Sequence, residues 1–357
     1  MAGSESVVPI REAFPPPARN KEKSSVTSLK SADERKGRGV DARAEHGTLP
    51  RHFMTSNPLH RHITARDQEI LAALFKCPLT VEQLRKASNT FVLPFQSPRR
   101  VRRRLHVLVA MGHTQRFRYA TSSEGSSPYY YKLTLAGLRL LLGKDAKPPT
   151  TGFLKEISIG HHEHTQHLAD FIVHTLVAAK TRSVALTDLC GENTVRLEVG
   201  GENLFPDCCF RLVDPKGQPW NFVVELDCST ETVRSAKNLE SWQRKVRLYE
   251  QFQDSRQSRF RVLVLTTKSR QRRDHILRVA SEEAKNRGRL IFYGAYLPDY
   301  LAAIDPISGT CFLDHNAAPV ALVPGFAAAP DQHGAASPLS RTPLVPAVAL
   351  ATAPALR

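Results

Sequence analysis

The fold of this chain is decided by residues 205–227, FPDCCFRLVDPKGQPWNFVVELD. Asp207 stands directly before one apolar run, and Glu225 and Asp227 follow a second run at 221–224. The residues between the two runs, Asp-Pro-Lys-Gly, have the composition of a turn. The stretch therefore predicts two buried strands joined as a hairpin, with acids 18 residues apart across the turn.

The three carboxylates, Asp207, Glu225 and Asp227, need a positive partner if they lie beside hydrophobic strands, because an uncompensated buried charge is costly. A hard divalent cation is the usual partner, since Mg²⁺ takes one or two carboxylates together with water and phosphate oxygens. We therefore predict a Mg²⁺ (or Mn²⁺) site with Asp207 and Glu225 as ligands, and phosphodiester chemistry is the first functional hypothesis.

The composition agrees with a polyanionic partner. The chain has 357 residues, which is enough for about two domains plus tails. Lysine and arginine exceed aspartate and glutamate by 50 to 34, which gives a formal charge of +16 and a pI near 9.8. Such a balance favours nucleic acid over an acidic small molecule, with an anionic membrane surface as the alternative.

The six cysteines show neither a CxxC spacing nor the density of a disulfide framework, which is typical of reduced, mostly buried thiols. The first residues lack a basic segment followed by an apolar one, and no run approaches about 18 apolar residues. We expect a soluble, cytoplasmic protein that does not insert into a membrane.

Residues 59–145 form the first block in which the sequence predicts order. Thr64 with Asp67, and Thr80 with Gln83, have the spacing of capping boxes at the starts of two helices. Apolar residues at helical spacing follow each of them. Two helices are therefore expected at the beginning of this block.

A third helix is expected from Arg99 to Met111, between Ser97 as N-cap and Gly112 as the C-terminal stop. Two β-like stretches, 115–120 and 129–133, follow it and are separated by a polar connection. Three helices followed by a β-hairpin are typical of a winged helix-turn-helix.

The third helix and the hairpin are strongly basic, with seven arginines and no acid from Arg99 to Arg118. A solvated face normally mixes charge signs for i,i+4 pairing, so a run of one sign favours contacts with nucleic acid. We predict that this block binds DNA through six arginines, four on the helix and two on the hairpin: Arg99, Arg100, Arg102, Arg103, Arg116 and Arg118.

Residues 151–312 form a second block with an α/β plan. The pattern predicts a helix, a β-meander, a long helix at about 230–252, a strand, a helix and a last strand at 290–293. The flanking tails, 1–58 and 316–357, are rich in polar residues or in alanine and proline. We expect both tails to be largely disordered, because neither buries enough surface to offset chain entropy.

Pro-Asp on one strand and Glu-x-Asp on the next, in this order of elements, resembles the core of the PD-(D/E)XK nuclease-like superfamily. The resemblance implies that Asp207 and Glu225 hold metal and that a lysine two residues after the glutamate orients the attacking water. Here Asp227 stands at the lysine position. Some relatives supply the basic group from the next helix, where Lys245 and Tyr249 lie one turn apart. The implied catalytic set is Asp207, Glu225, Asp227 and Lys245.

A longer pattern covers roughly residues 60–300. Its matching residues are Pro206, Asp207, Glu225, Asp227, Ser229, Thr230, Glu231, Lys245 and Tyr249, preceded by His167-Leu168-Ala169-Asp170. With a basic helical block ahead of it, this pattern resembles the bacterial replication-relaxation family of plasmid and mobile-element proteins. The resemblance implies a DNA-binding accessory protein of plasmid replication or conjugative mobilisation, relaxase or replication proteins as partners, and accessory roles for His167 and Tyr249.

A hypothesis of a different class remains open. Asp207 could pair with Lys245, and Glu225 with Asp227 could belong to an ordinary buried ion network. The α/β domain would then be a catalytically inert assembly module, and the protein a non-enzymatic winged-helix regulator of transcription or replication.

Two further motifs have competing interpretations. The tract 161–167 holds four histidines, but a structural zinc site needs four closed ligands and no partner pair stands out, so a dedicated metal site is disfavoured. Tyr129-Tyr130-Tyr131 could stack on bases, whereas alternating aromatics in a strand more often form core on one face, and we favour core.

Overall fold

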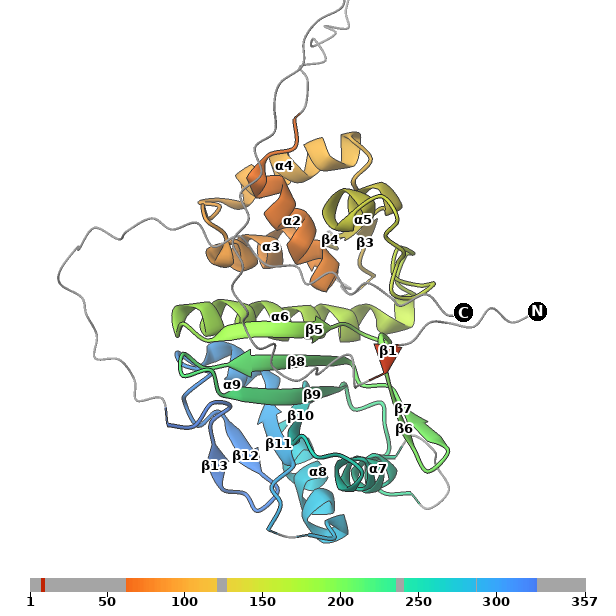
Figure 1. Cartoon of the computed structure of the whole chain (residues 1–357), viewed down its shortest axis with the longest axis vertical. Helices are drawn as coiled ribbons and strands as arrows, with labels where there is room; N and C mark the ends of the chain where they lie inside the picture. Colours follow the sequence, from red (N-terminus) through yellow and green to blue (C-terminus); the bar gives the residue numbers. More distant parts are fainter. Residues whose placement is uncertain (1–7, 10–61, 121–126, 236–240, 287, 326–357) are drawn as a thin grey trace, which may run out of the picture.

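The computed structural model of the protein describes residues 8–9, 62–120, 127–235, 241–286 and 288–325 (Figure 1). The predicted N-terminal tail lies outside these ranges apart from a two-residue strand, β1 (Val8–Pro9). The C-terminal tail lies outside them from residue 326.

The described part of the first block contains four α-helices and a small sheet that includes a hairpin. Its elements are α2 (Ala65–Lys76), β2 (Leu79–Thr80), α3 (Val81–Ala87), the 3₁₀ turn η1 (Ser88–Thr90), α4 (Pro98–Ala110), β3 (Thr114–Arg118), β4 (Tyr129–Leu133) and α5 (Leu135–Leu142). The hairpin of β3 and β4 was expected, whereas β2 was not, and it pairs with β4 to give the order β2-β4-β3.

The helix signals in this block act as the sequence indicated. Both capping boxes, at the starts of α2 and α3, are formed. Ser97 occupies the N-cap of α4 with extended backbone, although its side chain makes no capping hydrogen bond. Gly112 follows the helix with φ of +74°, a conformation that glycine adopts without strain.

The second block confirms the α/β class. Its elements are η2 (Ile159–His161), α6 (His162–Thr181), β5 (Ala185–Cys190), β6 (Val195–Val199), β7 (Glu202–Leu204), β8 (Cys208–Val213), β9 (Pro219–Asp227), α7 (Trp242–Asp254), β10 (Phe260–Thr266), α8 (Arg270–Glu283), β11 (Phe292–Tyr296), α9 (Leu297–Ala302), β12 (Phe312–Asp314) and β13 (Pro319–Val320). The main sheet has the order β13-β12-β11-β10-β9-β8-β5, in which β9, β10 and β11 are parallel to one another. A second sheet, β1-β6-β7, lies beside it.

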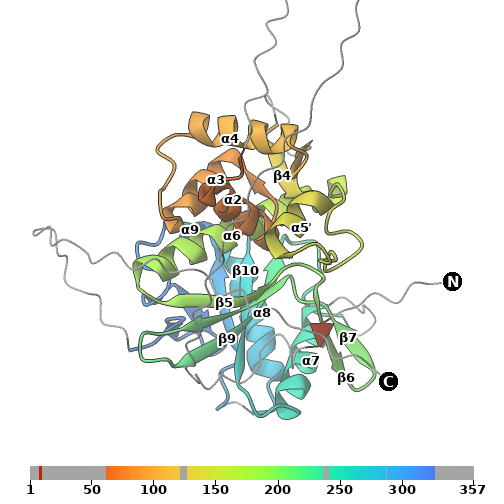
Figure 2. The same ribbon diagram turned by 45° about the horizontal axis from the view of Figure 1, so that its top comes forward.

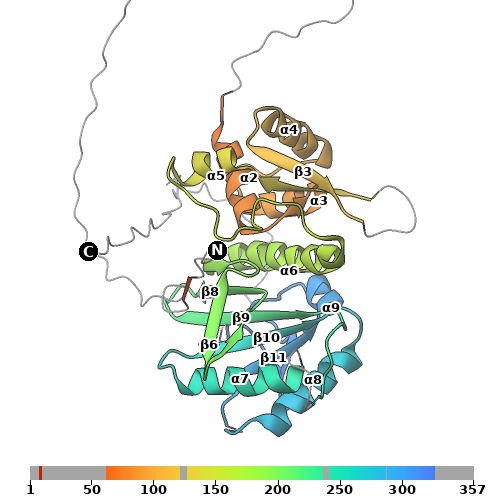
Figure 3. The same ribbon diagram turned by 90° about the vertical axis from the view of Figure 1, so that its right-hand side faces the viewer.

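Helices cover both faces of the main sheet, with α6 and α9 on one face and α7 and α8 on the other (Figure 3). Successive residues of a strand point to opposite faces. Val224 and Leu226 of β9 belong to the apolar cluster on the α6 side, and Val223 belongs to the cluster on the α7 and α8 side. Glu225 and Asp227 therefore point toward α7 and α8.

Helix α6 joins the two blocks, because α3 packs against it and one apolar cluster runs from the first block through α6 to the sheet. The side-chain amide of Gln83 donates to the Gln166 carbonyl at 3.2 Å and to Asp170 Oδ1 at 2.9 Å. On the hairpin side, Ala120 N donates to His162 Nδ1 at 2.8 Å. Helix α4 lies at the end of the molecule away from the sheet (Figures 1 and 2).

The structure corrects three boundaries in the second block. The helix expected from residue 230 begins only at Trp242, because Ser241 Oγ accepts from Arg244 N at 3.3 Å and caps it. The last predicted strand, 290–293, is β11, and it extends to residue 296. The tail predicted from residue 316 starts too early, since β13 pairs with β12 and Leu322 is fully buried. β12 and β13 are three and two residues long, which is too short for the alternation of apolar and polar residues that marks a strand in a sequence.

None of the helices in the described part of the chain combines the length and apolar character needed to cross a membrane.

One of the seven arginines between 99 and 118 points inward. Arg104 donates to both carboxylate oxygens of Asp67, whose side chain is fully buried. Thr64 donates to Asp67 Oδ2 through its backbone N and its hydroxyl, each at 2.7 Å. Burial alone would raise the pKa of Asp67, but the hydrogen bonds from Arg104 and Thr64 outweigh it and lower this pKa.

Replacing Arg104 with alanine should destabilise the protein by about 2–3 kcal/mol at neutral pH, because Asp67 would stay buried without its cation. A carboxyl with a lowered folded pKa contributes stability above its unfolded pKa and loses it as the pH falls through the folded pKa. Urea unfolding should therefore show the deficit of Arg104→Ala shrinking in acid. The control Arg103→Ala should change stability by less than about 0.5 kcal/mol. Equal stability of Arg104→Ala and wild type would contradict this assignment.

Candidate functional site

The acids at the two strand ends meet because β8 and β9 pair antiparallel, with Cys208 opposite Val224. Asp207 N donates to the Val224 carbonyl at 3.0 Å, and Leu226 N donates to Asp207 Oδ2 at 2.6 Å. The carboxylate of Asp207 is thereby fixed by the backbone of β9, beside Glu225. This convergence of Asp207 and Glu225 is what the hairpin pattern predicted.

Glu225 is buried, with only 2% of its surface exposed. Lys245 Nζ lies 2.8 Å from Glu225 Oε2, and the Tyr249 hydroxyl donates to Oε1. Lys245 and Tyr249 lie one turn apart on α7 and so reach the same carboxylate. Lys245 Nζ is also 2.6 Å from Oε1 of Glu231, which lies in the loop between β9 and α7. One ammonium group is thus shared by two carboxylates.

The pKa values in this cluster reflect burial and mutual attraction. Burial raises the pKa of Glu225 to about 7, although the attraction of Lys245 opposes the shift. Burial also raises the pKa of Glu231. For Lys245 burial acts to lower the pKa, but the nearby carboxylates of Glu225, Glu231 and Asp207 outweigh it and raise it.

Asp227 makes a separate buried ion pair. Arg272 of α8 donates to its two oxygens at 2.9 and 2.8 Å, and Trp242 Nε1 donates to Oδ1 at 3.2 Å. The side chain of Asp227 is fully buried. The sequence predicted that Asp227 assists catalysis. In this structure both oxygens of Asp227 accept hydrogen bonds, and Asp227 holds α7 and α8 against β9.

The histidine beside the acids is His164 and not the predicted His167. His164 Nε2 lies 3.1 Å from Asp207 Oδ1. Burial acts to lower the pKa of His164, but interaction with Asp207 and Cys228 raises it to about 11. His167 lies 3.7 Å from Glu163 on its own helix. The two histidines are three residues apart and share a helical face, so only packing decides which of them meets Asp207.

In this arrangement the predicted ligands of Mg²⁺ or Mn²⁺, Asp207 and Glu225, already face protein groups. Asp207 faces Leu226 N with one oxygen and His164 with the other. Glu225 faces Lys245 and Tyr249. Mg²⁺ needs carboxylate oxygens that are open to it and room for several waters. Within the described ranges no group of three His, Cys, Asp or Glu residues is placed to hold a metal ion. The positive charge is supplied by Lys245.

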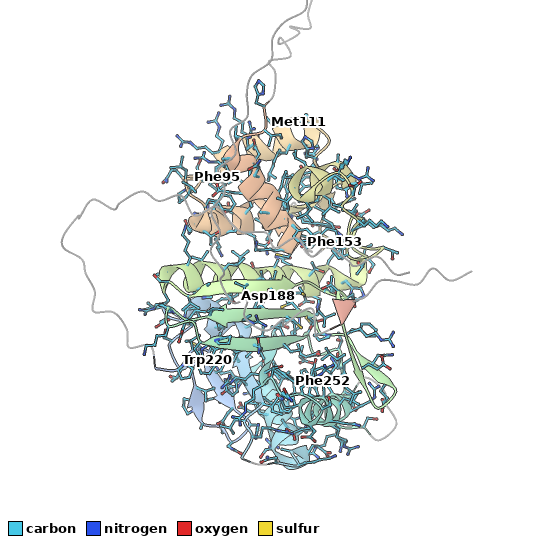
Figure 4. The ribbon with its side chains drawn as sticks, viewed as in Figure 1. Phe95, Met111, Phe153, Asp188, Trp220 and Phe252 are labelled. Carbon is cyan, nitrogen blue, oxygen red and sulfur yellow. The ribbon has the colours of Figure 1, made fainter. Side chains whose placement is uncertain are left out.

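The six predicted DNA-contacting arginines, Arg99, Arg100, Arg102, Arg103, Arg116 and Arg118, are all exposed. Helix α4, which carries four of them, runs between Phe95 and Met111, both labelled in Figure 4. Among the residues that the structure describes, no acid forms an ion pair with any of the six. The guanidinium carbons of Arg116 and Arg118 lie 4.9 and 5.3 Å from the centre of the Tyr129 ring.

A second group of basic residues lies at the start of α8, namely Lys268, Arg270, Arg272 and Arg273, and its members form ion pairs. Lys268 pairs with Glu163, Arg270 with Asp299, and Arg272 with Asp227. By contrast, the six arginines of α4 and the hairpin are exposed and have no ion pair with an acid among the described residues. The sequence distinguished the two clusters only by the absence of acids between residues 99 and 118.

The raised pKa of Glu225 predicts a specific pH dependence. A carboxyl whose folded pKa is above its unfolded value stabilises the fold fully below the unfolded pKa and loses this contribution as the pH rises through the folded pKa. For Glu225 this window runs from 4.5 to about 7. Wild type should therefore lose stability relative to Glu225→Gln as the pH rises across the window, measured by denaturant unfolding. A constant offset between wild type and Glu225→Gln across this window would contradict the assignment.

Comparison with known proteins gives one match. A model of the replication-relaxation family matches residues 76–263, from the end of α2 into β10. No curated protein and no solved structure was found to match. The matched region contains the basic surface together with Asp207, Glu225, Lys245 and Tyr249, and it spans more than half of the sequence. The chain therefore belongs to the replication-relaxation family.

Proposed function

We propose that this protein is a DNA-binding accessory protein of plasmid replication or mobilisation, and that its α/β block is a non-enzymatic assembly module. Membership of the replication-relaxation family points to plasmid replication or mobilisation. The observation that carries DNA binding is a set of six exposed arginines on α4 and β3 that pair with no acid in the part of the chain that the structure describes.

The placement of α4 supports contact with duplex DNA. In a winged-helix interpretation α4 is the recognition helix, and the hairpin of β3 and β4 is the wing. Helix α3 is covered by α6, whereas α4 lies at the free end of the molecule (Figure 3). A helix fits the major groove, which is about 12 Å wide. Arg99 and Arg103 share the outward face of α4 at i,i+4, and Arg116 and Arg118 on β3 reach phosphates beside it.

The acidic cluster supports an inert α/β block. Water activation needs a base or a metal-bound oxygen with a free position toward the substrate. Lys245 is held between Glu225 and Glu231, and both Glu225 oxygens are occupied. The predicted cleavage chemistry has one observation in its favour, the convergence of Asp207, Glu225 and Lys245, and it therefore stands as the second candidate function.

Replacing both Arg99 and Arg103 with alanine should flatten the dependence of log K on log salt by about 1–2, because each lost phosphate contact removes about 0.9 from the slope. The measurement is fluorescence anisotropy with a labelled duplex over a series of salt concentrations. Arg278→Ala is the matched control, since Arg278 is exposed on α8, at the opposite end of the molecule from α4. An unchanged slope in the double variant would show that α4 is not the DNA contact.

Incubation with supercoiled plasmid in Mg²⁺ or Mn²⁺ distinguishes the two candidate functions. We expect no cleavage beyond that of an Asp207→Asn control, because the carboxylate oxygens are occupied by protein groups. Nicking or linearisation by wild type that is lost in Asp207→Asn and in Lys245→Met would establish the nuclease and refute the inert module.

A further inference from the structure

A groove of about 530 Å³ opens where the hairpin, α4, α3 and α6 meet. Its positive lining comes from three elements: Lys86 of α3, Arg102 of α4 and Arg116 of β3. On the helical wheel Arg102 lies on one flank of α4, with His106 one turn later, while Arg99 and Arg103 face outward. The arginines of α4 thus serve two surfaces, one open to solvent and one facing the groove.

Two tyrosines of β4 give the groove an aromatic wall. Tyr129 is half-buried, and the guanidinium of Arg116 lies over its ring at 4.9 Å. Tyr131 is buried, and burial raises its pKa while Arg116 and Arg102 act in the opposite direction. Both guanidinium groups therefore converge on this wall. The sequence-based preference for core holds for Tyr130 and Tyr131, whereas Tyr129 is only half-buried and has the guanidinium groups of Arg116 and Arg118 beside its ring.

The far wall is polar and closes the groove. Gln166 and Asp170 of α6 line it, together with Gln83 of α3. The side-chain amide of Gln166 has no hydrogen-bond partner within the described parts of the chain. An amide and a carboxylate present donors and acceptors to the edge of a nucleobase. The volume of the groove lies in the range of about 300–1,000 Å³ of pockets that take small ligands, which suits one nucleotide better than a duplex.

We propose that this groove binds a single unpaired nucleotide extruded from the DNA that α4 holds. The base stacks on Tyr129, its edge meets Gln166 and Asp170, and its phosphate lies among Lys86, Arg102 and Arg116. Base–aromatic stacking tolerates any base, so the groove recognises unpaired structure more than sequence. The inference rests on the proposed DNA binding and adds the form of DNA that is preferred.

The test compares two labelled duplexes of the same sequence, one fully paired and one with a single extrahelical thymidine, by fluorescence anisotropy. Wild type should bind the bulged duplex about tenfold more tightly, the size expected for one stacked base. Tyr129→Ala should abolish the preference, and Tyr129→Phe should keep it because the ring remains. Lys86→Ala should weaken only the bulged complex, since Lys86 lies on α3, apart from Arg99 and Arg103 on the outward face of α4. Thermal unfolding checks that the variants are folded.

The outcomes separate this inference from the proposed function. Equal affinity of wild type for the two duplexes, or an undiminished preference in Tyr129→Ala, would overturn the groove assignment and leave duplex binding intact. Binding to neither duplex would refute the proposed function and the groove assignment together.

Discussion

The arrangement of the α/β block depends on how the carboxylates of β9 are compensated. Glu225 is buried on the sheet face, and an unpaired charge there would cost several kcal/mol or force protonation. Lys245 meets it because α7 begins at Trp242, with Ser241 as the N-cap that sets the position of the first turn. Asp227, two residues along the same strand face, takes Arg272 of α8. The two carboxylates thus fix both helices on this face of the sheet.

The sequence predicted this site as far as local patterns reach. The turn and the two apolar runs predicted the hairpin, and the spacing of Lys245 and Tyr249 predicted that they act together. What the sequence could not supply was the partner of each acid. Asp227 meets Arg272 across 45 residues of chain. His164 is distinguished from His167 only by the packing of α6 on the sheet.

The basic surface shows how local charge and tertiary structure combine. The run of seven arginines without an acid predicted a DNA-binding surface made of six of them, without Arg104. Arg104 departs from it because it lies three residues after Val101, beside the buried stripe, and there it pairs with Asp67. Arg102 differs from the outward-facing Arg99 and Arg103 because it lines the groove beside β4. The angular position of each arginine around α4 separates these residues. The sequence therefore contained this separation, although the number of arginines alone did not show it.

Helix α6 sets the geometry between the two blocks. It carries His164 beside the acidic cluster, Gln166 and Asp170 beside the groove, and Phe171 in the apolar cluster shared with the sheet. Blocks joined by a mobile linker can reorient, whereas blocks that share one buried helix and one apolar cluster hold a fixed orientation. Under the proposed function, a protein partner bound to the α/β block would therefore lie at a set position relative to DNA on α4. The proposed accessory role would then rest on this fixed placement.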